Sequence, residues 1–133
     1  NSYGPGETIG SVHITVPDTM TMADIHPLTK SIAVHLYKKF GIAMTVGVYA
    51  ENQPSVEVLE IRQALDQVVS LYTHVVQVHA FYVHEEKKVI YYDIIFDFDE
   101  EDPHGTLEKI KAEMQKRCPE YTQFAIVDTD FSN

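Results

Sequence analysis

Residues 75–98 read VVQVHAFYVHEEKKVIYYDIIFDF, and this stretch decides the fold. Two runs rich in β-branched and aromatic residues, 75–83 and 89–98, flank the polar segment 84–88. Such runs with a short polar link between them are typical of a β-hairpin. The second run is apolar at odd and at even positions. We therefore expect helices on one face of its sheet and a partner module on the other.

Helical periodicity flanks the hairpin on both sides. An apolar stripe predicts a helix over residues 56–72. After the hairpin, Asp102 and Pro103 open a second helix, which is expected to end near Cys118 and Pro119. Its inward side is expected to carry Leu107, Ile110 and Met114. A last strand is predicted over residues 122–130, so this half of the chain has the order αββαβ.

The N-terminal part repeats the last three of these elements. A strand over residues 9–16, a helix that ends at Gly41 and a strand over residues 42–49 form a βαβ unit, whose strands should be parallel. The helix can begin at a capping box of Thr21 and Asp24, or at Asp24 itself. We favour Asp24, because that start puts Pro27 in the first turn.

The predicted fold class is α+β, a ferredoxin-like αββαβ sandwich. Residues 53–133 are expected to form one complete module, and residues 1–52 a truncated copy (βαβ) that lacks the opening helix and most of the first strand. The linker is expected in the polar segment 50–55, which contains Pro54.

Composition narrows the classes of function. The net charge of −10 leaves no basic stripe for nucleic acid. No apolar run reaches the roughly 20 residues that a membrane helix needs, and no signal peptide is visible. A single cysteine, Cys118, fits a reducing compartment. No nucleophile–base pair or phosphate loop stands out, so we expect a soluble, intracellular, non-enzymatic piece of a longer protein.

Several segments resemble the cytoplasmic C-terminal domain of the cation diffusion facilitator (cation efflux) family. They are the glycine-proline segment 2–6, the strand 10–17, the stretch 20–25 with its helix up to Gly41, and, in the second copy, residues 76–79. The resemblance covers essentially the whole chain in tandem copies.

This resemblance implies a parent protein that exports divalent cations such as zinc, manganese or iron(II) in exchange for protons. The chain would then be a regulatory and dimerisation domain on the cytoplasmic side of the membrane. Its expected partners are a second copy of itself, as a homodimer, and an upstream transmembrane half that carries the transport. A divalent metal is the expected cofactor.

The family pattern implies metal ligands at matching positions. In the first copy these are His13 on the strand and His26 near the start of the helix. The family's final His-x-Asp motif is replaced there, and only Glu51 could substitute. A degenerate site, with both histidines at the surface, is the alternative interpretation.

In the second copy the corresponding positions are His79, Asp93, Asp128 and Asp130, and His104 could approach from the following helix. Asp128 and Asp130 share one strand face, as i and i+2 must. Imidazole and carboxylate together suit zinc or manganese. The alternative is that these aspartates are solvated or cap a turn.

Other polar groups are interpreted as ordinary surface. The acidic run 97–102 is typical of a solvated loop, and His74 and His84 flank the hairpin. Self-association is expected through a sheet face that bears Val89, Tyr91 and Ile95. Two alternatives stay open: a ferredoxin-like sensor of a small organic ligand, and a purely structural dimerisation module.

Overall fold

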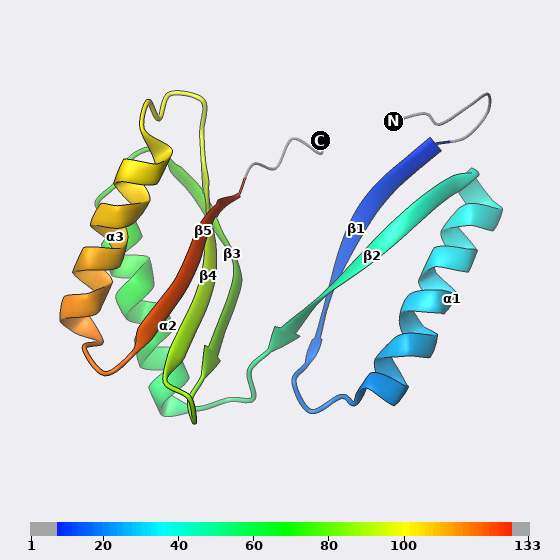
Figure 1. Ribbon diagram of the computed structural model, residues 1–133, viewed down its shortest axis with the longest axis horizontal. Helices are drawn as coiled ribbons and strands as arrows, with labels where there is room; N and C mark the ends of the chain where they lie inside the picture. Colours follow the sequence, from blue (N-terminus) through cyan, green and yellow to red (C-terminus); the bar gives the residue numbers. More distant parts are fainter. Residues whose placement is uncertain (1–7, 129–133) are drawn as a thin grey trace. The chain divides into compact units, whose positions relative to one another are not determined.

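The structure, a computed structural model, describes residues 8–128. They form five strands in two sheets and three helices, so the predicted α+β class is confirmed (Figure 1). The chain divides into two compact units, residues 1–53 and 54–133. No helix in the described part of the chain combines the length and the apolar character needed to cross a membrane.

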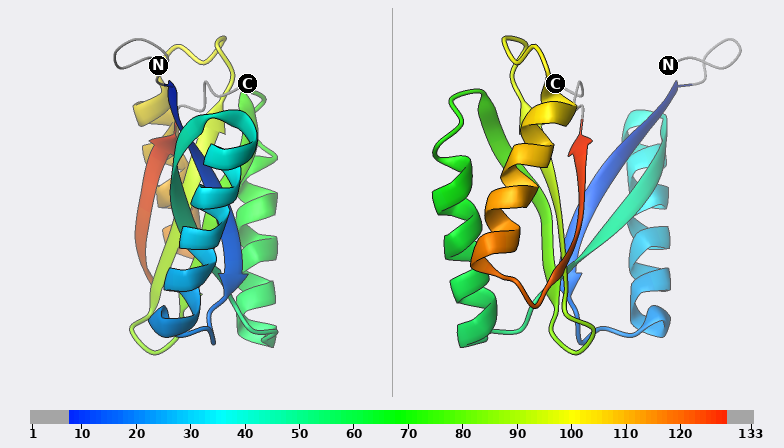
Figure 2. Two further views of the ribbon diagram at one scale, coloured as in Figure 1. Left: turned by 90° about the vertical axis from the view of Figure 1, so that its right-hand side faces the viewer. Right: turned by 60° about the vertical axis from the view of Figure 1, so that its left-hand side comes forward.

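The second unit is a three-stranded mixed sheet with two helices on one face (Figure 2). Its order is α2 (Val56–Val69), β3 (Val75–His84), β4 (Val89–Phe96), α3 (Pro103–Arg117) and β5 (Thr122–Asp128). Strand β4 lies in the middle, antiparallel to β3 and parallel to β5. The hairpin and the αββαβ order are as the sequence predicts.

The core of this unit lies between the helices and one face of the sheet. Helix α2 contributes Ile61, Leu65 and Val68, and α3 contributes the predicted trio of Leu107, Ile110 and Met114. Strand β4 buries its even-numbered residues Ile90, Tyr92 and Ile94 completely. Its odd-numbered residues therefore lie on the other face, which no helix of the unit covers. We call this second face the open face.

Two irregularities in β3 decide which of its residues reach the open face. The pairing with β4 shifts between Val75 and Gln77 and again between His79 and Tyr82. At the second shift Ala80 has φ 55°, the left-handed region that residues with a Cβ rarely adopt. The extra residue lets Phe81 and Val83 pack in the core while His79 and Tyr82 pair with open-face residues of β4.

The first unit is smaller and has little interior. Strands β1 (Thr8–Pro17) and β2 (Ile42–Glu51) pair in parallel as predicted, and α1 (Met22–Phe40) connects them. Val16 is the one hydrophobic residue in the described part of this unit that is buried, and α1 has no buried residue. The helix ends as predicted at Gly41, whose φ of 68° suits glycine.

The start of α1 differs from the favoured prediction. Thr21, not Asp24, is the N-cap: the Thr21 side chain accepts the Asp24 N–H, and the Asp24 carboxylate accepts the Thr21 N–H at 3.1 Å. This capping box satisfies two backbone donors at once, and the earlier start places Pro27 inside the helix, where it removes one backbone hydrogen bond. The linker also starts later than predicted, because β2 continues to Glu51.

Candidate metal centres on the open sheet face

Three of the predicted metal ligands lie on the open face of the second unit. His79 of β3 pairs directly with Asp93 of β4. Asp128, the last residue of β5, lies opposite Ile95, which is two residues beyond Asp93 on the same face. The His79 Nδ1 atom is 4.0 Å from the Asp128 Oδ2 atom. The three strands thus bring one imidazole and two carboxylates into one neighbourhood.

The electrostatics of this group are unfavourable for negative charge. The pKa of Asp93 is raised, chiefly because the side chain is partly buried and also because the Asp128 carboxylate is close; His79 opposes the shift. A positive charge beside the two carboxylates would favour their ionised forms. The arrangement can therefore attract a cation.

The other two predicted members of this site are not assembled with it. Asp130 lies outside the described residues. His104 is exposed in the first turn of α3, a helix that packs on the opposite face of the sheet from His79, Asp93 and Asp128.

The first unit does not bring its predicted ligands together. The His13 ring stacks on Tyr49 at 5.0 Å between centroids and lies over Gly47, its register partner. Odd positions of these strands therefore face away from the side on which Val16 is buried. His26 is exposed, in a surface hollow along α1. Glu51 shares the His13 face but is four residues farther along, about 13 Å on a strand.

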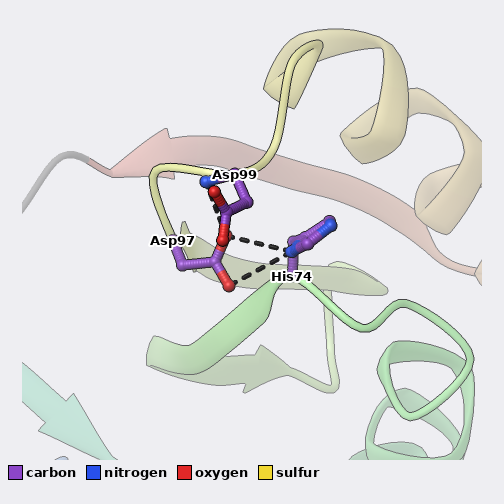
Figure 3. Close-up of side chains that lie close together, drawn as sticks. All are labelled: His74, Asp97 and Asp99. Atoms are coloured by element: carbon purple, nitrogen blue, oxygen red, sulfur yellow. Dashed lines mark hydrogen bonds and ion pairs between the residues drawn. The ribbon is translucent and has the colours of Figure 1, made fainter.

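The tightest group of ligand atoms is one that the sequence interpretation set aside. His74, just before β3, and Asp97 and Asp99, just after β4, bring three ligand atoms within 4.8 Å of one another (Figure 3). Among the described residues, His79, Asp93 and Asp128 are not drawn together as closely. The hairpin pattern in the sequence could have predicted this group. In an antiparallel pair, the residue before the first strand lies beside the residue after the second.

Hydrophobic side chains cover the other end of the open face. Tyr91 of β4 stacks on its register partner Phe124 of β5, with ring centroids 5.8 Å apart. Tyr91, Phe124 and Ile126 are 38%, 68% and 55% exposed. Of the other two predicted interface residues, Val89 is partly buried and Ile95 is buried. The open face thus joins an apolar area to an acidic, histidine-containing one.

Comparison with family models, with curated proteins and with solved structures found no match to this chain.

Proposed function

We propose that this chain is the cytoplasmic regulatory and dimerisation domain of a divalent-cation/proton antiporter, and that it senses the exported cation at His79, Asp93 and Asp128. The observation that carries the proposal is the convergence of these residues from three strands on one sheet face. The resemblance of the glycine-proline segment and the following strand to cation efflux proteins supports the transporter context.

The residues fit a borderline divalent cation such as zinc or manganese. Neutral imidazole and carboxylate are both ligands that these ions accept. The separation of 4.0 Å between His79 Nδ1 and Asp128 Oδ2 leaves room for a small inward movement of both side chains. A bound cation would supply the positive charge that lets Asp93 and Asp128 be ionised side by side.

The same face offers a way to couple cation binding to self-association. Two copies that meet through Tyr91, Phe124 and Ile126 would bring their acidic groups close together. The cation would lower this repulsion, so that the dimer forms more readily when the cation is abundant. In a transporter, this change would bias the arrangement of the attached membrane segments.

The test is the thermal stability of the chain with and without zinc. A ligand that binds only the folded state raises the melting temperature, so zinc should raise it at neutral pH. The effect should fade as the pH falls and protons compete for His79. Asp128→Asn keeps the shape of the side chain and removes one charge. In this variant, the change that zinc causes in the ¹⁵N NMR signals of the His79 imidazole should be much smaller than in the parent chain.

An unchanged zinc response of His79 in Asp128→Asn would contradict this site. If the dimer forms equally well with and without zinc, and zinc leaves the His79 signal unchanged, the purely structural dimerisation module would be favoured.

A further inference from the structure

Two loops meet at the end of the three-stranded sheet where β3 begins and β4 ends. The Asp97 N–H donates to the His74 carbonyl at 2.9 Å, which continues the β3–β4 pairing by one residue pair. His74 Nδ1 lies 3.1 Å from one oxygen of Asp97 and 3.2 Å from the other. The loops therefore hold the imidazole against the carboxylate.

Asp99 completes a compact group. Its N–H donates to Asp97 Oδ1 at 2.9 Å, a turn that brings its side chain back toward His74 (Figure 3). One nitrogen and two oxygens, each from a different side chain, then lie within 4.8 Å of one another. The side chains of His74 and Asp97 are 41% and 39% exposed, so water can reach the group.

The other acids of the same loop have different tasks. Glu100 accepts the Asp102 N–H, and Asp102 accepts the Gly105 N–H as the N-cap of α3. Among the described residues, no Lys or Arg side chain forms a salt bridge with Asp97 or Asp99; the basic side chains that form ion pairs do so with acids outside this loop. In the described part of the chain, the basic side chain that faces Asp97 is the His74 imidazole.

We propose that His74, Asp97 and Asp99 form a second divalent-cation site, distinct from the His79 group and suited to a first-row transition cation such as Zn²⁺. The imidazole favours such an ion over calcium and magnesium, which prefer all-oxygen ligands. Water completes the coordination, because the group is half exposed. The site does not depend on the transporter role.

Occupation of this site has two consequences. The cation displaces the proton that His74 shares with Asp97, so binding weakens as the pH falls. It also ties the segment before β3 to the loop between β4 and α3, which reduces the freedom of both loops.

The test follows the histidine imidazoles by ¹⁵N NMR while Zn²⁺ is added to the chain. His74→Gln assigns the His74 signal. We expect Zn²⁺ to shift the His74 ring nitrogens, and Asp97→Asn to weaken this response by at least the roughly 10- to 100-fold that loss of a mere supporting group costs. Glu101→Gln is the matched control, because it removes one charge from an exposed residue of the same loop. It should change the affinity about twofold or less.

Two results would overturn the proposal. One is a His74 signal that responds to pH but not to Zn²⁺, and the other is a loss of Zn²⁺ affinity in Glu101→Gln as large as the loss in Asp97→Asn. The site is separable from the proposed function. Asp128→Asn should leave the His74 response intact, and a chain in which His74 responds while His79 does not would count against the His79 site alone.

Discussion

Asp93 is a carboxyl group in surroundings that disfavour its negative charge. Its side chain is partly buried next to Asp128, and its raised pKa reflects both facts. His79 lies directly across the strand pair but does not cancel these effects. A carboxylate held in such a place costs stability unless a positive charge lies beside it, and carboxylates with raised pKa values are common at functional sites.

Because these surroundings disfavour the ionised carboxylate, removal of its charge should increase the stability of the folded chain. A carboxyl group whose pKa is higher in the folded than in the unfolded state binds more protons when folded, so stability falls as the pH rises from the usual value of 3.8 through the raised one. Asp93→Asn should therefore be more stable than the parent at neutral pH without metal, and this difference in stability should become smaller below pH 3.8. Urea unfolding at several pH values measures this, and an asparagine variant that is less stable at neutral pH would contradict it.

A second residue-scale feature joins three segments of the second unit. Glu57 of α2 accepts hydrogen bonds from the Tyr121 hydroxyl and from Lys88 Nζ, and Lys88 also lies over the Tyr121 ring. The hydrogen bond from Tyr121 is the main reason why the pKa of Glu57 is lowered. This group contributes to stability above the usual carboxyl pKa, and the contribution is lost as the pH falls through the lowered value.

At the scale of elements, the two βαβ segments differ in how much they bury. Helix α3 packs with Ile110 and Met114 completely buried, and both helices of its unit share that core. Helix α1 has no buried residue, and its sheet has two strands in the described part of the chain. Caps and a glycine stop define α1 well, but burial supplies most of a helix's stability in a protein.

Amide hydrogen exchange should reveal this difference. Strand β4 is paired on both sides and covered by the core, whereas β1 pairs with β2 alone within residues 8–128. Exchange in β1 should be faster than in β4 by on the order of tenfold or more, which corresponds to about 1.4 kcal/mol in opening free energy. Equal protection would mean that a further segment or a second copy covers β1 in solution.

At the scale of the whole molecule, the chain is a tandem of two units that share the order βαβ. The second unit adds α2 and β3 to that order; it contains the buried core, the His74 group and the residues His79, Asp93 and Asp128. Its open face keeps exposed aromatic residues beside the acidic groups. An exposed apolar area of this kind is typical of an interaction surface.

The exposed position of Phe124 predicts a specific effect on association. At 68% exposure, Phe124 contributes little to the core of its own unit, so Phe124→Asp should leave the circular dichroism spectrum intact. It should reduce the proposed dimer to monomer in sedimentation, because it places a charge in the centre of the Tyr91–Phe124 surface. Ala112→Asp, at an exposed position on α3, is the matched control and should not change the mass. A Phe124→Asp dimer of unchanged stability would place the interface elsewhere.

The sequence by itself determined the class and the order of the elements. The local signals are helical periodicity, Asp102 with Pro103, Gly41, and the two β-branched and aromatic runs that flank residues 84–88; each acts over a few residues. They also predicted the inward trio of Leu107, Ile110 and Met114, because one helical stripe faces one core.

Only the tertiary structure decided which ligands meet. The shift at Ala80 sets which side chains of β3 face Asp93, and the end of β4 at Phe96 places Asp97 beside His74. In the first unit, the side of α1 on which His26 lies separates it from His13. Strand register and bulges arise from pairing between distant segments, and a one-residue shift moves a side chain to the other face. The residue pattern within one segment therefore does not predict the register or the bulges.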